Sequence, residues 1–224
     1  MARLLSFLKV SWDKLYRIPN DYPFEKVALV GPSAVAYHAI GRAGCSLGDT
    51  IVVQGAGPIG LLVAMIVRIA GVSNIIVTEV QRFSLGIAEE MGFTVIDGSH
   101  DDVVKEVKRI TEGRGADVVF TAAPVKETAI DITRLIRPHG KVVIFALFKE
   151  PTAVDLLNLS FTEGYIYGSR VYTPVDFERT VRMVVSGELQ VEPLITHRMS
   201  LHDVEKGIQL VKSGEDVMKV ILSP

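Results

Sequence analysis

The sequence has 224 residues, of which 48% are hydrophobic and 22% are charged, with 19 Gly and 10 Pro. This composition is typical of a globular protein and excludes collagen-like, coiled-coil and intrinsically disordered chains. The formal net charge of −2 gives no bulk electrostatic reason to expect nucleic acid or an anionic membrane as a partner.

The number of cysteines and the length of the apolar segments limit the possible metal sites, cellular location and membrane association of the protein. Cys45 is the one cysteine in the sequence, which excludes an internal disulfide and a zinc site built from several cysteines. A chain with so few cysteines is expected to be cytoplasmic. The longest apolar segment, residues 59–70, contains Arg68 and is too short to cross a bilayer as a helix, so no membrane partner is expected.

From Thr50 onward, short apolar segments alternate with amphipathic ones. Runs rich in β-branched residues predict six strands, at Thr50–Gln54, Asn74–Thr78, Thr94–Asp97, Asp117–Thr121, Lys141–Phe145 and Gly164–Gly168. The segments between them predict four helices, at Pro58–Ala70, Phe83–Met91, Asp102–Thr111 and Lys126–Ile136. Pro138-His139-Gly140 is expected to separate the last helix from the following strand. Continuous apolar strands joined through helices predict an α/β fold with a doubly wound, six-stranded parallel sheet.

The two ends of the chain do not fit this repeating pattern. Capping residues predict helices from Thr173 to Ser186 and from Ser200 to about Ser213, and Val217–Leu222 is expected to be an unpaired terminal strand. The first thirty residues place aromatic side chains among prolines without a clear period. We therefore expect a central domain at residues 31–187, flanked at 1–30 and 188–224 by remnants of a second domain.

The strongest chemical signal is a glycine-rich segment between the first predicted strand and its helix. Its functional members are Gly55, Gly57, Pro58, Ile59 and Gly60. The first glycine permits a tight turn, the second lets the backbone approach a pyrophosphate, and the third allows close helix–strand packing. The proline presets the first helical turn, whose free N–H groups and dipole face the phosphates. The segment predicts a dinucleotide-binding domain of the Rossmann type.

An acidic residue completes this motif at the adenosine end. Glu79 ends the second predicted strand, nineteen residues after Gly60. Its carboxylate is expected to accept hydrogen bonds from the ribose hydroxyls and to repel a 2′-phosphate, which favours NAD(H) over NADP(H). NADP(H) remains an alternative because of Arg82 and Lys141, since a nearby cation could accommodate the 2′-phosphate. The alternative is that the glycines serve only a turn and that Glu79 is a solvated strand end.

With these motifs, the chain resembles the cofactor-binding half of the zinc-dependent medium-chain alcohol dehydrogenases, in the sorbitol, butanediol and threonine dehydrogenase branch. The matching segments are residues 13–19, 34–40, 48–60, 115–119 and 192–198. The resemblance implies hydride transfer between a secondary alcohol and NAD. It also implies cofactor contacts at Ile59, at Phe145, Ala146 and Leu147 after the fifth strand, and at Ser169 and Arg170 after the sixth. From the residues alone, Phe145–Leu147 could equally be sheet core, and Arg170 a surface or interface charge.

The sequence departs from that family at the catalytic metal. We expect the N-terminal domain that carries the family's zinc ligands to be missing, and Gly31-Pro32 stands where this branch has Glu-Pro with its carboxylate at the metal. Ser84 replaces a basic residue that the family often places near the adenosine. No two histidines have the spacing of a helical zinc motif, and His38 is interpreted as a packing histidine. We therefore expect neither zinc nor a catalytic residue in this chain.

Two functions remain open. The chain is either the NAD(H)-binding portion of a zinc-type alcohol or polyol dehydrogenase or a non-catalytic NAD(H)-binding sensor or assembly module. In the first case it is expected to be inactive alone, and its catalytic half is encoded separately, was removed or was lost. The sixth strand is an edge through which this family commonly joins two sheets, so a homodimer through residues 164–168 is one option in both cases. Alcohol-dependent NADH formation on addition of a zinc-binding domain would favour the first function. A stable but inert dimer would favour the second.

Overall fold

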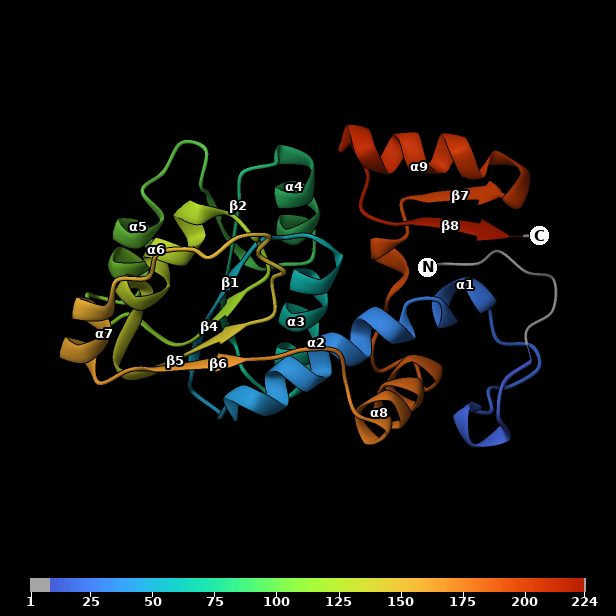
Figure 1. Cartoon of the computed structure of the whole chain (residues 1–224), viewed down its shortest axis with the longest axis horizontal. Coiled ribbons are helices and arrows are strands. Elements are labelled where there is room, and N and C mark those ends of the chain that lie inside the picture. The colour runs from blue at the N-terminus through green and yellow to red at the C-terminus, as the bar shows by residue number, and fades with distance from the viewer. Residues whose placement is uncertain (1–8, 224) are drawn as a thin grey trace.

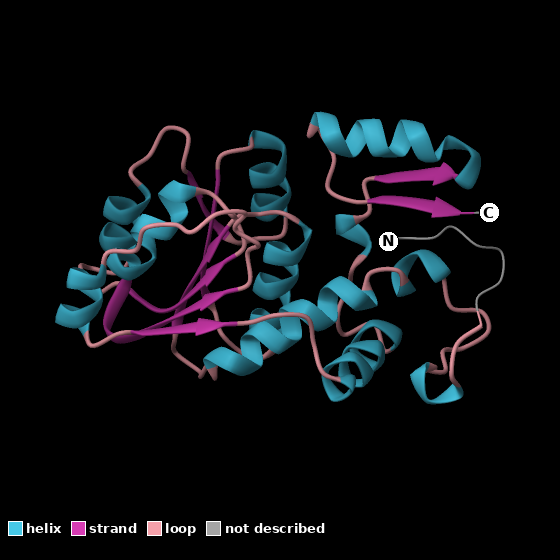
Figure 2. Ribbon diagram, viewed as in Figure 1, coloured by secondary structure: helices cyan, strands magenta, loops and turns pink. Residues whose placement is uncertain are grey.

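The computed structural model of the protein describes residues 9–223 (Figure 1). Residues 1–8, which belong to the predicted N-terminal remnant, and Pro224 lie outside the described residues. The described chain is dominated by one sheet with helices on both of its faces, and a smaller group of elements lies beyond the helices of one face (Figures 1 and 2).

The main strands follow the predicted order along the chain. They are β1 (Thr50–Gln54), β2 (Asn74–Glu79), β3 (Thr94–Asp97), β4 (Ala116–Thr121), β5 (Ile136–Ile144) and β6 (Tyr165–Gly168). The helices that connect them are α3 (Pro58–Ile69), α4 (Arg82–Glu90), α5 (Val103–Ile110), α6 (Lys126–Leu135) and α7 (Leu156–Thr162). Helix α7 was not predicted, because its seven residues are too few to show an amphipathic period. Leu156, Leu157 and Phe161 of this helix are exposed.

The sheet has the strand order β3-β2-β1-β4-β5-β6, and every neighbouring pair is parallel. The predicted α/β fold of the Rossmann type, a doubly wound, six-stranded parallel sheet, is therefore confirmed. Helices α3 and α4 cover one face, and α5, α6 and α7 cover the other (Figure 1). The strand order reverses between β1 and β4, and sheets of this class bind their ligands at the carboxyl ends of the strands beside such a switch point.

Each face of the sheet has its own apolar core. Ile51 and Val53 belong to the core under α3 and α4, whereas Val52, between them in β1, belongs to the core under α5 and α6. Alternate residues of a strand point to opposite faces, so a strand covered on both faces must be apolar throughout. This double burial explains why the strands read as continuous apolar runs in the sequence.

Strand β5 is longer than predicted. Ile136 already pairs with Ala116, and after a shift in register the pairing resumes between Lys141 and Val118. Within this segment His139 adopts a left-handed backbone conformation with φ of 59°, and Pro138 has no N–H to donate. Pro138-His139-Gly140 is thus an irregularity inside the strand. The prediction that the fifth strand begins at Lys141 was therefore wrong, because β5 begins at Ile136.

The C-terminal residues form a second, two-stranded sheet with a covering helix. The elements from residue 174 onward are α8 (Pro174–Val185), η2 (Glu192–Leu194), β7 (His197–Ser200), η3 (Leu201–Asp203), α9 (Val204–Ser213) and β8 (Val220–Ser223). Strand β8 pairs in parallel with β7, so the expectation of an unpaired terminal strand was wrong. Three of the four β7 residues, His-Arg-Met-Ser, are polar, and this composition hid the partner strand.

The N-terminal described residues form η1 (Trp12–Lys14), α1 (Phe24–Val27) and the long helix α2 (Val30–Ala43). Helix α2 is rich in alanine, and its buried small side chains contribute to the same core as α3 and α8. Elements α1, β7, β8 and α9 gather at the end of the molecule away from α7 (Figure 1). Segments from the two ends of the chain therefore lie on the same side of the main sheet.

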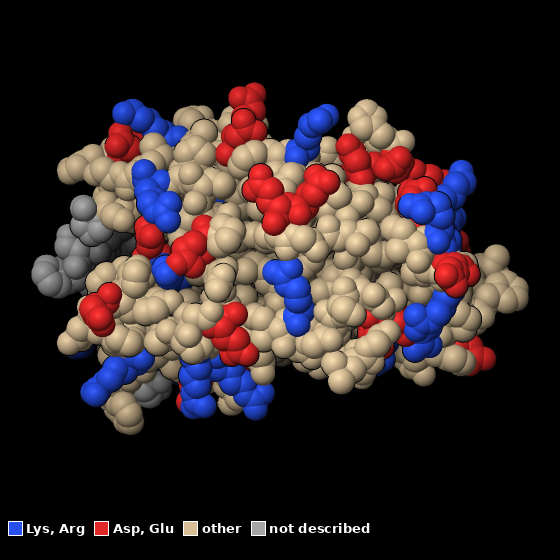
Figure 3. Space-filling model, turned by 180° about the vertical axis from the view of Figure 1, so that it is seen from behind, with Lys and Arg blue, Asp and Glu red and all other residues tan. Residues whose placement is uncertain are grey.

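No helix within residues 9–223 is long and apolar enough to cross a membrane. On the face that Figure 3 shows, acidic and basic side chains are interspersed rather than separated by sign.

A buried carboxylate joins the amino ends of β1 and β4. Asp117 has a side chain only 4% exposed, and its Oδ2 accepts the N–H of Thr50 at 2.8 Å. Its Oδ1 accepts from the guanidinium groups of Arg114 and Arg137. Burial opposes ionisation, but the three donors outweigh it and hold the pKa of Asp117 below its ordinary value.

We expect Asp117→Asn to lower the free energy of unfolding by about 2 kcal/mol, because a charged hydrogen-bond acceptor is lost. A depressed folded-state pKa stabilises the fold above the unfolded-state pKa of about 4, and this stabilisation is lost as the pH falls through the lower folded-state value. The difference from wild type in urea unfolding should therefore be largest near neutral pH and shrink below about pH 4. Exposed Asp21→Asn is the control, and an equal effect of both substitutions would contradict the assignment.

Candidate cofactor-binding site

The glycine-rich segment lies directly after β1, at the switch point of the sheet. Gly55 has φ of 103°, which favours glycine, and its N–H donates to the carbonyl of Thr78 in β2 at 2.8 Å. A Cβ added to Gly60 would lie 1.9 Å from the carbonyl oxygen of Gly55. The predicted roles of these two glycines in the turn and in close packing therefore agree with the local geometry.

Gly57 is different, because it faces open space. A Cβ added there would meet nothing within 4 Å. Gly57 is the N-cap of α3, Pro58 occupies the first turn, and no side chain caps the helix. The first turn of an α-helix carries N–H groups without intrahelical acceptors, so this uncapped end offers donors and a positive dipole to an anion.

The carboxylate of Glu79 lies at the end of β2 and holds the neighbouring backbone. Its Oε2 accepts the N–H of Ala56 in the glycine segment at 2.8 Å. Its Oε1 accepts the N–H groups of Val80 at 2.7 Å and of Gln81 at 3.0 Å. Glu79 is therefore not merely a solvated strand end, since it ties the glycine segment to the loop after β2. A carboxylate has about four acceptor positions, so one remains for another donor.

A cavity of about 950 Å³ opens beside Gly55 and Glu79. Its walls come from the carboxyl ends of β1, β2 and β4 and from the facing helices α5 and α6. A volume of this size is within the range of small-molecule and cofactor sites. The other predicted site residues do not line this cavity.

Several lining residues were not predicted. The apolar ones are Val80, Val103, Val104, Ala123 and Val125, and the polar ones include Gln54, Thr78, Thr128, Asp102 and Asp131. Gln54, Thr78 and Ala123 stand at or just beyond strand ends, and that placement is a signal the strand order alone could have supplied. The residues of α5 and α6 come together only because these helices lie side by side on one face, and no sequence spacing marks them.

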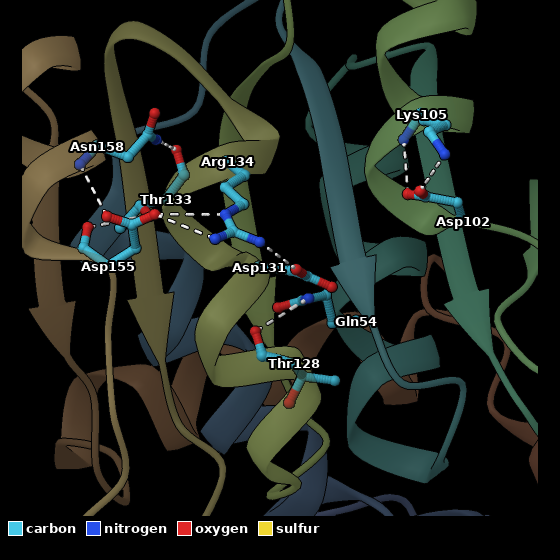
Figure 4. Close-up of polar contacts among 9 residues, drawn as sticks. All are labelled: Gln54, Asp102, Lys105, Thr128, Asp131, Thr133, Arg134, Asp155 and Asn158. Atoms are coloured by element: carbon cyan, nitrogen blue, oxygen red, sulfur yellow. Dashed lines mark hydrogen bonds and ion pairs between the residues drawn. The ribbon is translucent and has the colours of Figure 1, made fainter.

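The helical side of the cavity is acidic and partly ion-paired (Figure 4). Lys105 pairs with Asp102 at 2.9 Å, and Arg134 pairs with Asp155 at 3.3 Å. Burial raises the pKa of Asp131; the nearby Arg134 opposes this shift, while the charges of Asp102 and Glu127 add to it. The carboxylates in this wall are close enough to repel one another, so the wall is unfavourable for a phosphate.

The residues predicted at the nicotinamide end follow β5 and β6 along the same edge of the sheet. The N–H groups of Phe145 and Ala146 donate to the carbonyl of Thr121 at 3.3 and 3.0 Å, and that of Ser169 donates to the carbonyl of Ile144 at 2.9 Å. Among the described residues that are not exposed, the Ser169 hydroxyl is a buried side-chain oxygen without a hydrogen-bond partner. An orphaned buried hydroxyl at this edge is available to a ligand.

The remaining predicted site residues are exposed or half-buried. Leu147 and Arg170 are exposed beyond the ends of β5 and β6, and Ile59 is half-buried in the first turn of α3. Arg82 begins α4 and is exposed; its charge helps to lower the pKa of Asp97, after the hydrogen bonds from Ser99. Glu79 thus ends β2, and Gly55, Phe145 and Ser169 follow β1, β5 and β6 along the same edge of the sheet.

The described residues do not fit a zinc ion. Within residues 9–223 no group of three or more His, Cys, Asp or Glu side chains is placed to hold a metal. Burial raises the pKa of the Cys45 thiol to about 11, with a further contribution from Asp49, so the thiolate that binds metals is disfavoured. His38 donates from Nδ1 to the Asp176 carboxylate at 2.8 Å, which is a structural contact between α2 and α8.

The fold and this edge define a class of protein, the α/β domains that carry a glycine-rich fingerprint at a Rossmann switch point. Comparison with known families makes the assignment specific. The sequence profile described as zinc-binding dehydrogenase matches residues 58–186. The chain belongs to this family of oxidoreductases, as the resemblance in its motifs predicted.

Individual relatives agree. The chain is 32% identical over 214 residues to (R,R)-butanediol dehydrogenase of Neisseria gonorrhoeae, covering 94% of this chain and 60% of the relative. It is similar to the crystal structure of 2R,3R-butanediol dehydrogenase from Bacillus subtilis, with a TM-score of 0.86, 28% identity and coverage of 93% and 60%. It is also similar to a zinc-binding dehydrogenase of Sinorhizobium meliloti bound to NADP, with a TM-score of 0.86, 29% identity and coverage of 93% and 62%. The chain thus spans about three fifths of the length of these relatives.

We expect Gly60→Ala to destabilise the fold by about 3 kcal/mol, because its methyl group must displace the Gly55 carbonyl. Urea unfolding of the purified variant would measure this loss. Gly86→Ala in α4 is the matched control, since a Cβ there meets nothing within 4 Å and alanine favours a helix interior. Equal stability of the two variants would contradict the close packing at Gly60.

Proposed function

We propose that the chain binds NAD(H) as the cofactor-binding portion of a zinc-type alcohol or polyol dehydrogenase. The observation that carries this proposal is the uncapped N-terminus of α3, open at Gly57, with the Glu79 carboxylate beside it. This arrangement supplies donors for a pyrophosphate and an acceptor for a ribose within one short segment. Both features come from described residues of a chain in this family.

The strand ends suggest the direction in which the dinucleotide lies. The pyrophosphate faces the first turn of α3 at Gly57, Pro58 and Ile59. The adenosine enters the cavity beside Glu79, between Val80 after β2 and Val125 after β4. The nicotinamide half then extends toward Phe145, Ala146 and Leu147 after β5, and toward Ser169 and Arg170 after β6. The orphaned Ser169 hydroxyl supports this end of the site because it lacks a protein partner.

A preference for NAD(H) over NADP(H) follows from charge. A 2′-phosphate on the adenosine ribose would approach the Glu79 carboxylate and the acidic wall of the same cavity. Arg82 begins α4 near this end, but it also faces the carboxylate of Asp97. The other cations in the cavity wall, Lys105 and Arg134, are already paired with Asp102 and Asp155. We infer that repulsion outweighs the attraction of Arg82. The relative from Sinorhizobium meliloti is bound to NADP.

When bound, the nicotinamide ring accepts or donates the hydride in the reaction. The residues of this chain hold and orient the cofactor, and we infer that the groups that bind and activate the alcohol come from outside residues 9–223. We propose a secondary alcohol or polyol as the substrate class, because the relatives include butanediol and sorbitol dehydrogenases. The chain alone is then inactive, and a cytoplasmic location fits its single free cysteine.

Exposed apolar residues support a partner at the end of the molecule that carries α1. Trp12, Leu15 and Phe24 are exposed there, and exposed apolar residues that lie together favour a contact with a partner. We propose that residues 9–30 and 188–223 contact the catalytic domain, with residues 31–187 as the NAD-binding domain. Alcohol-dependent NADH formation on mixing with a zinc-binding domain of this family would support this division. An assembly that remains inert would favour the non-catalytic NAD(H) sensor.

The edge of the sheet at β6 supports a homodimer. Strand β6 is the last strand in the sheet, and Leu156, Leu157, Phe161 and Tyr165 on α7 and β6 are exposed. An exposed apolar edge strand readily pairs with another chain. We propose that two copies join through this edge.

The proposed cofactor site predicts saturable binding of NADH and binding of NADPH at least about tenfold weaker, because one charged contact changes sign. Calorimetric titration of the purified chain measures both.

Gly57→Ala should fold with a stability within about 1 kcal/mol of wild type, since its new Cβ meets no protein atom. It should nevertheless weaken NADH binding at least about tenfold, because the methyl group occupies the approach of the pyrophosphate. If Gly57→Ala bound NADH as tightly as the wild-type chain does, the proposed position of the phosphates would be contradicted.

The dimer predicts that Phe161→Glu, at a side chain 81% exposed, raises the dimer dissociation constant at least about tenfold by placing a charge in an apolar contact. Sedimentation velocity over a concentration series measures this change. Val175→Glu in the first turn of α8, where the side chain is also exposed, is the matched control and should leave the association unchanged. A monomeric wild-type chain would exclude the proposed interface.

A further inference from the structure

One buried amide at the candidate site has a role that neither the glycine motif nor the family resemblance assigns. Gln54 is the last residue of β1, and only 1% of it is exposed. The other β1 residues at this depth are apolar or threonine. A buried amide is unfavourable unless its polar atoms are hydrogen-bonded, so the contacts of Gln54 show what its retention achieves.

The side chain of Gln54 bridges two segments that belong to β4 and α6. Its Oε1 accepts the hydroxyl of Thr121, at the end of β4, at 3.0 Å. Its Nε2 donates to the backbone carbonyl of Thr128, in the first turn of α6, at 3.3 Å (Figure 4). The orientation of the amide is fixed by its partners, because a carbonyl can only accept.

These contacts secure the loop between β4 and α6, which forms one wall of the cavity. The backbone carbonyl of Gln54 accepts the N–H groups of Ala122 at 2.9 Å and Ala123 at 3.1 Å. The Thr128 hydroxyl lies 2.8 Å from the carbonyl oxygens of both Ala123 and Val125. Every hydrogen bond in this set therefore links the end of β1 to the loop or closes the loop on itself.

The wall lies close to the glycine segment. A Cβ placed on Gly55 would be 3.2 Å from both the backbone nitrogen and the Cβ of Ala123. Gly55, Gln54, Ala123 and Val125 all line the same cavity. The separation between the glycine segment and the loop after β4 thus depends on how firmly that loop is held.

We propose that Gln54 is a positioning residue for the adenosine half of the dinucleotide. It holds the wall formed by Ala123 and Val125 at a fixed distance from the glycine segment, and it does not contact the reacting nicotinamide. This inference rests on the proposed NAD(H)-binding function and adds the residue that sets the shape of the adenosine site.

The test replaces Gln54 with methionine, which has a similar length and tolerates burial but forms neither hydrogen bond. Amide hydrogen exchange of residues 122–128 should become faster in Gln54→Met. Affinity for NADH and for ADP-ribose should fall by a similar factor of about ten, because both ligands carry the same adenosine half. The fluorescence emission maximum of bound NADH should not move, since the nicotinamide end is unchanged.

Val52→Ala is the matched control, because Val52 lies on the same strand and points to the same face of the sheet. It should reduce stability by removing buried methyl groups while leaving both affinities at the wild-type value. Thr121→Val removes only one of the two side-chain bonds and should give an intermediate loss of affinity. This variant also provides a test if Gln54→Met does not fold.

The outcomes separate the two claims. A wild-type chain that binds neither ligand would overturn the proposed function. A wild-type chain that binds both, with Gln54→Met and Thr121→Val binding equally well, would overturn the role of Gln54 alone. A loss confined to NADH, or a loss matched by Val52→Ala, would also overturn it, because neither follows from a displaced adenosine wall.

Discussion

The parallel pairing of β1 with β4 is the constraint on which the candidate site depends. These strands are neighbours in the sheet, yet β2, β3 and three helices separate them in the chain. The helix after β1 covers one face and the helix after β4 covers the other, so a crevice opens at their carboxyl ends. Asp117 joins the two strands at their amino ends, and Gln54 joins them at the crevice. Both contacts place a buried polar group where a slipped register would leave it unpaired.

Backbone groups provide much of the site that follows from this pairing. The N–H groups at the start of α3 are exposed because Gly57 has no side chain and no residue caps the helix. The Glu79 carboxylate accepts from three backbone N–H groups across two loops, so the residue that we propose to bind the ribose also fixes the turn beside it. A substitution at Glu79 therefore changes loop order and ligand charge together, whereas Gly57→Ala perturbs only the space in front of the helix.

The main sheet could be predicted from the sequence because local pattern and tertiary environment agree there. The strand at Thr50–Gln54 is covered on both faces, and its apolar run reflects that burial directly. The errors arose where a local rule was overridden. Pro138 and Gly140 are strong turn signals, but β5 begins before them, and its pairing with β4 resumes after them with a shift in register. His197–Ser200 has too few apolar residues to indicate a strand and becomes one only through its partner β8. At the candidate site, the glycine motif could be recognised from sequence. Gln54 could not, because in the sequence it is a single polar residue beside a glycine. Its hydrogen-bond partners, Thr121 and Thr128, come from distant segments.

The same reasoning separates cofactor binding from metal binding in this chain. Gly31 stands in the first turn of α2, at the position where the family resemblance of the sequence implies a metal-facing glutamate. A Cβ at Gly31 would meet nothing within 4 Å, so the packing of α2 does not require a glycine there. The buried alanines of α2 pack in the core shared with α3 and do not depend on residue 31. The position can therefore lose a carboxylate without disturbing the helix that supports the glycine segment.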